Sequence, residues 1–412
     1  RWGIGALAYA FLVLLSPWAG YTDLKTTALL VTGLAIFIES SSMACDAVLQ
    51  AHEKVQYQTI GQLLSAVVYF VLAIAALDAG YGLMGIIWSN VISRLVRLVV
   101  MVPLMLKSTG PWQKQETAAE DRPTVRDMAK MGFPLFLATV FGILFNKVDS
   151  VMLNTMLGDV VTGIYGLGHR ALDIMIILPG LFGTAIFPAL TRYGQQSNED
   201  ARRLGERGMR YMMIVIVPLT LFLMFVADPI INWFDSSDQF ADSVIVLMIV
   251  IWGVPLQAAS IIFSRLLITA NQEKVFVRIG LGSMLANVSL NLFLIPRYSY
   301  FGASVATIIS MTVSLLLHYH FTRRTELRVP VLRSLFGPTV TVAVAWLLTS
   351  TVVGLVMPEW NISWRYLPVH EGWAAFLVPC GAMLLVYILS LRIGRVIGAD
   401  DLNLLKALRQ SK

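Results

Sequence analysis

Continuous apolar segments of about 20 residues recur along almost the whole chain, and they constrain its fold more than any other feature. A helix of that length spans the hydrocarbon core of a bilayer. Barrel strands, the other solution in lipid, are shorter and alternate apolar with polar residues. Hydrophobic residues make up 57% of the 412 residues and charged residues only 14%, which excludes a soluble globular protein. We therefore predict an all-α polytopic membrane protein.

The apolar windows predict twelve transmembrane spans, with both ends of the chain in the cytoplasm. The predicted spans are 4–20, 26–46, 58–77, 83–106, 131–157, 160–190, 209–227, 243–270, 276–296, 302–322, 335–357 and 372–391. Of the 31 Lys and Arg residues, the external loops of this topology hold only Lys25, Arg297 and Arg365. This asymmetry follows the positive-inside rule. Basic loops beside anionic lipid headgroups explain the net charge of +6 without a nucleic-acid partner.

Polar stretches divide the spans into groups. The predicted divisions are an N-terminal bundle at 1–106, a cytoplasmic linker at 107–130, a six-helix bundle at 131–322, two additional spans at 323–398 and a cytoplasmic amphipathic tail at 399–412. The tail has the one-sided apolar pattern of a helix that lies on a membrane surface.

An internal repeat relates the two bundles. The tripeptide Glu-Lys-Val at 53–55 recurs at 273–275, and Gly82 is matched by Gly302, each 220 positions later. Both copies have the same predicted orientation, so the repeat is of the parallel kind, and we expect two related bundles around a central cavity. The second bundle has six predicted spans and the first has four. We therefore expect two further helices ahead of Arg1.

Ionisable and amide residues cluster in the fifth and sixth predicted spans. The segment "FNKVDSVML" contains Asn146, Lys147 and Asp149, and the segment "GIYGLGHRALD" contains Arg170 and Asp173. A charged residue at the centre of a span costs about 2.5–3.5 kcal/mol on insertion scales, so it usually faces a water-filled cavity. We predict that these residues line such a cavity. The alternative is that they pair with each other and hold helices together.

The chemistry of the side chains divides these candidates into two roles. The predicted substrate-binding residues are Lys147, Arg170, Asn146 and Arg265, and the predicted ion-coupling residues are Asp149, Asp173 and Glu39. Cations attract an anionic headgroup, and the planar fork of arginine suits phosphate. The carboxylates would exchange a proton or a sodium ion. Snorkelling toward the interface is an alternative explanation for Arg265.

The sequence offers no evidence for a metal or a cofactor. His318 and His320 stand two apart on a predicted helix and so point in different directions. Cys45 and Cys380 lie far apart and form no metal motif. The chain has no Walker A motif, so we expect transport driven by an ion gradient or passive transport, coupled to H⁺ or Na⁺.

The order of four helices, a polar linker, six helices and two more resembles the polysaccharide and lipid-linked oligosaccharide flippases of the multidrug/oligosaccharidyl-lipid/polysaccharide exporter superfamily. The stretches "NKVDSVML", "GIYGLGHRALD", "FPALTRY" and "ANVSLNLFLIPRYSYFGASVAT" carry the resemblance. Full-length members typically have fourteen helices, so the resemblance implies that the first two are absent here. In similar lipid II flippases, an arginine in a Y-x-x-x-x-R setting lines the cavity. Arg170 matches it, although His169 replaces the acid common at the preceding position.

The resemblance implies a transporter of the bacterial inner membrane that flips an undecaprenyl-diphosphate-linked oligosaccharide by alternating access. Its partners would be the lipid-linked oligosaccharide, membrane lipids and polysaccharide assembly machinery. The first alternative is a cation-coupled drug or metabolite antiporter of the same superfamily, which would need a more apolar cavity. A membrane enzyme is disfavoured because the longest external loop, at 358–372, carries too few catalytic side chains. We therefore predict that the chain is not an enzyme.

Overall fold

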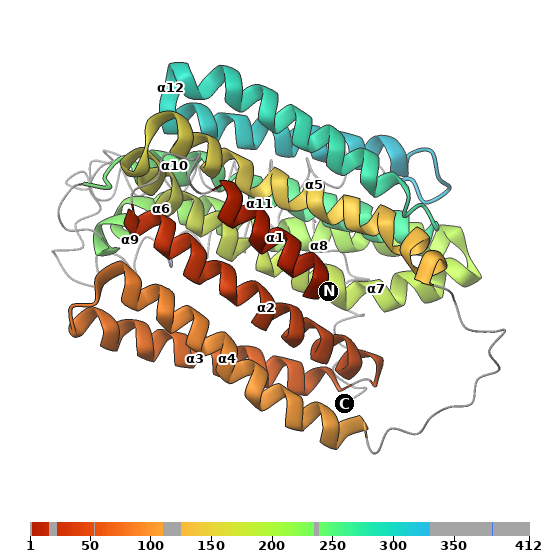
Figure 1. Cartoon of the computed structure of the whole chain (residues 1–412). Coiled ribbons are helices and arrows are strands. Elements are labelled where there is room, and N and C mark those ends of the chain that lie inside the picture. The colour runs from red at the N-terminus through yellow and green to blue at the C-terminus, as the bar shows by residue number, and fades with distance from the viewer. Residues whose placement is uncertain are drawn as a thin grey trace. The chain divides into compact units, whose positions relative to one another are not determined.

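The computed structural model describes residues 2–15, 23–52, 54–109, 125–234 and 239–329, together with residue 381. Within these ranges the chain is helical, with short turns and no strand (Figure 1). This finding confirms the predicted all-α class. The helices separate into two units, Arg1–Arg122 and Pro123–Lys412. The division falls inside the polar stretch 107–130.

Unit 1 contains four described helices. They are α1 (Trp2–Leu15), α2 (Asp23–Ala51), α3 (Val55–Asp78) and α4 (Gly82–Thr109). The tight turn between α3 and α4 depends on Gly80 and Gly82, which have φ values of 79° and 54° that only glycine adopts without strain. Both α2 and α3 pack against α4. A small buried cluster of Cys45, Leu49 and Met101 lies between α2 and α4.

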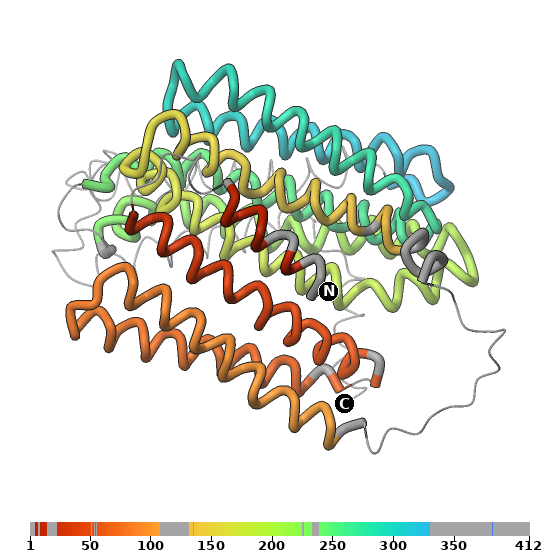
Figure 2. Tube along the Cα trace, viewed as in Figure 1, coloured from red at the N-terminus to blue at the C-terminus, as the bar shows by residue number. Residues whose placement is uncertain are grey.

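Unit 2 contains eight described helices. They are α5 (Val125–Leu157), α6 (Asp159–Met175), α7 (Ile177–Gln196), α8 (Asn198–Phe225), α9 (Ala227–Phe234), α10 (Ser243–Val250), α11 (Gly253–Thr269) and α12 (Val275–Thr322). One large apolar core joins α5 to α12, with Leu153, Tyr165 and Phe263 among its fully buried side chains. The chain path in Figure 2 shows α5 running alongside α12, and the two helices are in direct contact.

Helix α12 is a hairpin of two helices and not one long rod. Ser299 lies in the left-handed region, with φ 53°, and there the chain folds back on itself. A Cβ atom on Gly302 would lie 2.4 Å from the carbonyl oxygen of Leu294, so only glycine allows the two halves to approach this closely. Asn287 in the first half donates a hydrogen bond to Ser310 in the second half, at 3.1 Å. The hairpin therefore accommodates the two predicted spans 276–296 and 302–322.

Two other predicted spans are each divided into two helices. The span 160–190 corresponds to α6 and α7, which meet at Ile176, and the span 243–270 corresponds to α10 and α11, which meet at residues 251–252. The backbone of Ile176 keeps right-handed helical angles, and its N–H still donates to the carbonyl of Leu172. The chain therefore continues in nearly helical form across this break.

Eight of the described helical segments are long and apolar enough to cross a membrane, and α12 is one of them. The chain is therefore a polytopic membrane protein. The predicted spans 335–357 and 372–391 and the tail 399–412 fall outside the described residues, apart from residue 381. The predicted span 4–20 is described only as far as Leu15. The total of twelve spans therefore stays a prediction.

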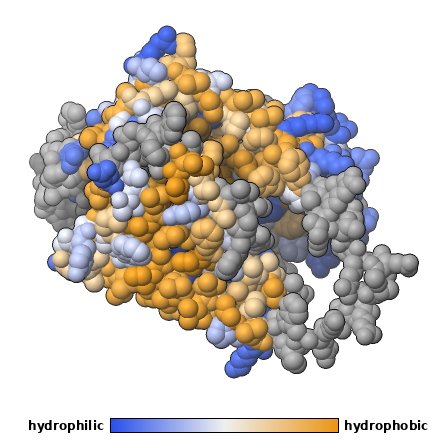
Figure 3. All heavy atoms as spheres, in the orientation of Figure 1, coloured by the Kyte–Doolittle hydropathy of each residue, from blue (hydrophilic) through white to orange (hydrophobic). Residues whose placement is uncertain are grey.

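The surface of the described helices is suited to lipid. Figure 3 shows apolar side chains over much of the visible surface of the described helices. Large apolar residues such as Phe70 on α3, Phe136 on α5 and Leu181 on α7 are more than half exposed. Water would oppose exposure of such extensive apolar area, whereas hydrocarbon does not.

The internal repeat predicted from sequence coincides with helix boundaries. Helix α3 begins at Val55 and α12 begins at Val275, which are the last residues of the two Glu-Lys-Val copies. Gly82 opens the second helix of one hairpin, and Gly302 lies just after the bend of the other. The α3–α4 pair and the α12 hairpin therefore share their start and their turn at the same spacing of 220 positions.

The chain beyond α12 is anchored to unit 2. Leu327 and Val329 are almost completely buried and belong to the large core of that unit. The amide of Asn198, at the start of α8, donates a hydrogen bond to Glu326. The basic stretch that follows the predicted span 302–322 is thus packed against the bundle as far as Val329.

Candidate functional site: charged clusters within the spans

The exposed cationic cluster of unit 2 consists of Lys147 on α5 and Arg170 and Asp173 on α6, together with His169, whose side chain is only 12% exposed. The Nζ atom of Lys147 lies 3.6 Å from Oδ2 of Asp173. The Nδ1 atom of His169 lies 3.6 Å from Oδ1 of the same carboxylate, one helical turn away. The side chain of Lys147 is 62% exposed, and Arg170 is also exposed. Arg170 makes no hydrogen bond within the described part of the chain, so its donors are available to a ligand.

Asp149 does not join this exposed cluster, although it is only two residues from Lys147. Its carboxylate is 2% exposed and points into the interior of unit 2. It accepts a hydrogen bond from the hydroxyl of Tyr165 on α6 and another, at 3.3 Å, from the hydroxyl of Thr307 on α12. The backbone N–H of Ser150 donates to its other oxygen at 2.8 Å. Asp149 is thus a buried carboxylate held by neutral donors from three helices.

A line of buried polar side chains follows the interior of the α12 hairpin near Thr307. Asn291 donates to Asn287 at 2.8 Å, and Asn287 donates to Ser310 at 3.1 Å. The Oδ1 atom of Asn291 is buried and has no partner among the described residues. Amide bonds of this kind hold helices together in membranes. Packing of the hairpin therefore leaves one buried acceptor, Oδ1 of Asn291, without a hydrogen bond in the described structure.

Asn146 and Arg265, the other two predicted site residues of unit 2, have partners outside the exposed cluster. The amide of Asn146 donates to the carbonyl of Gly142 in its own helix, at 2.7 Å. The guanidinium of Arg265 on α11 lies over the ring of Phe187 on α7, with 5.3 Å to the ring centroid. Its Nε atom is buried without a hydrogen-bond partner in the described structure. Neither side chain makes a hydrogen bond or an ion pair with Lys147 or Asp173 in the described part of the chain.

The charged network of unit 1 consists of Glu39 and Asp46 on α2 and Arg94 and Arg97 on α4. Glu39 accepts from Arg94 at 2.8 Å and from Arg97 at 3.2 Å. Arg97 also donates to Asp46 at 2.6 Å. The Nε of Arg94 donates to Asn90 at 2.9 Å. Of the seven predicted site residues, Glu39 is the one placed in this network, while the other six belong to unit 2.

Sequence reasoning did not identify Asp46, Asn90, Tyr165 or Thr307. Helical spacing could have indicated two of them, because Asp46 is seven residues after Glu39 and Asn90 is four residues before an arginine of the same helix. Helical spacing could not have indicated Tyr165 and Thr307, since their shared partner, Asp149, lies on a different helix. The described residues contain no group of three or more His, Cys, Asp or Glu side chains that could hold a metal ion.

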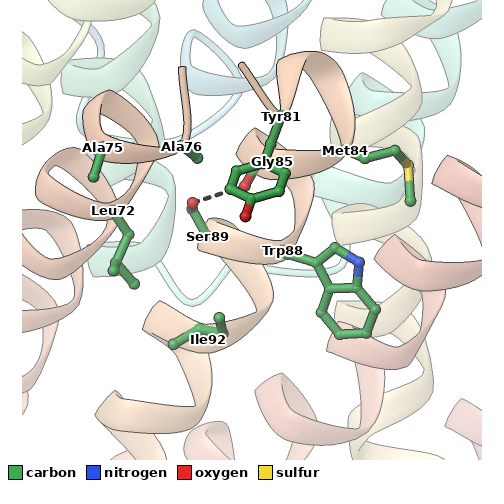
Figure 4. A pocket seen from close by; sticks show the side chains of 9 residues that line it. All are labelled: Leu72, Ala75, Ala76, Tyr81, Met84, Gly85, Trp88, Ser89 and Ile92. Atoms are coloured by element: carbon green, nitrogen blue, oxygen red, sulfur yellow. Dashed lines mark hydrogen bonds between the residues drawn. The ribbon is translucent and has the colours of Figure 1, made fainter. Parts of the chain in front are cut away.

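An apolar groove lies between α3 and α4 in unit 1 (Figure 4). It has a volume of about 580 Å³ and is open on one side. Its lining residues are Leu72, Ala75, Ala76, Tyr81, Met84, Gly85, Trp88, Ser89 and Ile92. The Ser89 hydroxyl donates a hydrogen bond to the carbonyl of Gly85, at 2.7 Å. The groove therefore presents mainly hydrocarbon and aromatic surface. It suits a lipid chain and not an anionic headgroup.

Comparison with known families classifies the chain. The sequence profile described as "polysaccharide biosynthesis protein" matches residues 1–245, which is more than half of the chain. The chain belongs to this family. The match confirms the resemblance drawn from the sequence.

Several curated relatives of the chain are flippases by name. The probable low-salt glycan biosynthesis flippase Agl15 of Haloferax volcanii is 23% identical over 186 residues, covering 45% of this chain and 39% of the relative. The probable lipid II flippase MurJ of Vibrio cholerae is 26% identical over 296 residues, covering 66% of this chain and 54% of the relative. The chain thus spans about half or less of the length of the curated relatives it matches.

Solved structures show the same fold. The inward closed conformation of the lipid II flippase MurJ superposes with a TM-score of 0.73 at 15% identity, over 95% of this chain and 81% of that one. A MATE transporter in complex with MaL6 gives a TM-score of 0.59 at 14% identity, over 78% and 75% of the two chains. The family member described here therefore has the fold of these transporters.

Proposed function

We propose that the chain is a transporter that flips a lipid-linked oligosaccharide across the cytoplasmic membrane by alternating access, with both of its ends on the cytoplasmic side. The observation that carries this proposal is the exposed cationic cluster of Lys147, His169, Arg170 and Asp173 on membrane-spanning helices. A diphosphate-linked sugar is the ligand whose charge such a cluster would neutralise. The flippase relatives named above support the proposal.

In this mechanism the headgroup and the lipid chain have different environments. Arg170 would donate two parallel hydrogen bonds to a phosphate, and Lys147 would add a point charge beside it. Asp173 would hold Lys147 in place when no substrate is bound. An undecaprenyl chain would remain in hydrocarbon while the sugar crosses. The assembly machinery for surface polysaccharide would use the product on the external side.

Ion coupling is proposed at Asp149. A buried carboxylate surrounded by tyrosine and threonine hydroxyls can bind a proton, or it can contribute hard oxygen ligands to a sodium ion. Uptake of either cation would remove the unpaired negative charge from the low-dielectric interior. The α12 hairpin, which supplies Thr307, would respond to the change. Glu39 belongs to a different network, with Arg94 and Arg97.

The test is Arg170→Ala, with flipping of a lipid-linked oligosaccharide measured in reconstituted vesicles. We expect a loss of about tenfold or more, equal to about 1.4 kcal/mol or more of lost interaction, with partial recovery in Arg170→Lys because charge is restored without the planar fork. Arg297→Ala is the matched control, since that guanidinium lies over the ring of its own helix neighbour Phe293. Unchanged flipping in Arg170→Ala at normal expression would overturn the role of Arg170.

A cation-coupled drug or metabolite antiporter is the second candidate, favoured by the fold shared with MATE transporters. Its cationic substrates would be repelled by Lys147 and Arg170. Drug resistance conferred on a sensitive host, without any flipping activity in vesicles, would favour this candidate.

A further inference from the structure

We propose that Arg94 and Arg97 in unit 1 form a second binding site for a phosphate oxyanion, and that Glu39 occupies this site when no ligand is present. The proposal rests on the proposed transport of a diphosphate-linked lipid and names a site for its headgroup that lies outside the cluster of unit 2.

The geometry around Glu39 is that of an occupied oxyanion site. One carboxylate oxygen accepts from Arg94 at 2.8 Å and the other accepts from Arg97 at 3.2 Å. Two guanidinium groups thus converge on the two oxygens of one anion. The same arrangement fits a phosphate. Glu39 is a carboxylate on a side chain with three rotatable bonds, so it can leave while the arginines stay.

The two arginines are held in position by residues other than Glu39. Arg97 is almost buried and donates to Asp46 at 2.6 Å. The Nε of Arg94 donates a hydrogen bond to Asn90, at 2.9 Å, and this asparagine lies one turn earlier on the same helix. The side chain of Arg94 is 36% exposed, so a ligand can reach it. Removal of Glu39 would therefore leave a preformed pair of donors.

The positions of unit 2 that match these residues by the repeat spacing carry no charge. Shifting by the repeat spacing of 220 positions places Ala259, Leu266, Ser314 and Leu317 at the positions of Glu39, Asp46, Arg94 and Arg97. Helices α11 and α12 pack well with these uncharged residues. Apolar replacement of a buried ion pair is often neutral or stabilising. In unit 1, moreover, Oδ1 of Asp46 and Nε of Arg97 are buried without partners in the described structure.

The test compares two isosteric variants that each remove one negative charge from the network. The dissociation constant for farnesyl diphosphate is measured by calorimetry on the purified chain in detergent. We expect Glu39→Gln to bind about three- to tenfold more tightly, because the competing carboxylate is gone. Asp46→Asn should show no gain, since Asp46 positions Arg97 and does not occupy the site. Arg94→Gln should weaken binding and, combined with Glu39→Gln, abolish the gain.

Further ligands identify the source of the phosphate. Tighter binding of farnesyl diphosphate in Glu39→Gln, with no change for farnesol, supports a phosphate site. An equal gain for inorganic pyrophosphate supports a site for the headgroup alone, and competition by phosphatidylglycerol vesicles assigns the same site to membrane lipid.

Three outcomes overturn the proposal: no gain in Glu39→Gln, the same gain in Asp46→Asn, or the same gain for farnesol. If Glu39→Gln does not fold, Glu39→Asp replaces it, since the shorter side chain cannot reach both arginines and the same gain is expected. Binding is measured without flipping, so failure of the Arg170 test leaves this result unaffected.

Discussion

Lys147 and Asp149 are neighbours on α5, yet they belong to two different regions of unit 2. Lys147 lies in the exposed cluster, where its partner is Asp173, a carboxylate that also contacts His169. Asp149 lies in the interior, where hydroxyl groups of Tyr165 and Thr307 are its partners. The side chain of Lys147 is 62% exposed, whereas Asp149 is 2% exposed. Under the proposed function, the first region would bind substrate and the second would couple the ion.

The largest effect is expected from Asp149→Asn. The amide keeps the shape of the side chain but cannot bind a proton or supply a charge to sodium. We expect flipping to lose its response to an imposed H⁺ or Na⁺ gradient, with a fall in rate of about 5–150-fold, the usual range of a coupling free energy. The measurement is flipping in vesicles with each gradient imposed in turn.

Tyr165→Phe is the matched control for Asp149. It removes one donor and leaves the carboxylate, so the gradient response should persist while the free energy of unfolding falls by about 1 kcal/mol. A gradient response that survives in Asp149→Asn would contradict the coupling role and leave the residue a purely structural one.

Asp173→Asn should have an intermediate effect. This carboxylate is partly exposed and holds Lys147 and His169, so its loss disturbs the substrate-binding region and not the core. We expect flipping to fall about tenfold, equal to about 1.4 kcal/mol, with the thermal midpoint unchanged. A large drop in the thermal midpoint would show that Asp173 is structural and would weaken the contrast with Asp149.

The smallest effect is expected from Lys147→Gln. An exposed ion pair contributes between zero and about 1 kcal/mol, so the rate should fall no more than about two- to fivefold. The loss should diminish as salt is added, because screening already weakens the charge. A loss as large as that of Asp149→Asn, or one that salt does not change, would place Lys147 in the coupling region instead.

Much of the fold follows from the sequence because lipid imposes strict rules on the backbone. The apolar runs locate the membrane helices, and the repeated Glu-Lys-Val tripeptides coincide with the starts of α3 and α12. The divisions of α6 from α7 and of α10 from α11 were not predicted, because a break at Ile176 leaves the hydropathy pattern unchanged. The bend at Ser299 was predicted only as a loop between two spans.

The candidate site could be predicted only in part. Helical periodicity accounts for the meeting of His169 and Asp173, since residues four apart share a helix face. It could not show that Asp149 faces the interior while Lys147 faces outward, because the direction of each face depends on how α5 packs against α12. It also could not bring Tyr165 to Thr307, which are separated by 142 positions. Such contacts depend on tertiary packing.

The burial of Leu327 and Val329 has a consequence for any movement of unit 2. These two side chains pack against the bundle just before the described range 239–329 ends. Beside them, Glu326 accepts a hydrogen bond from Asn198. The end of this range at Val329 is thus fixed to unit 2. In the proposed transport cycle, any tilt of unit 2 would therefore tilt Val329 by the same angle.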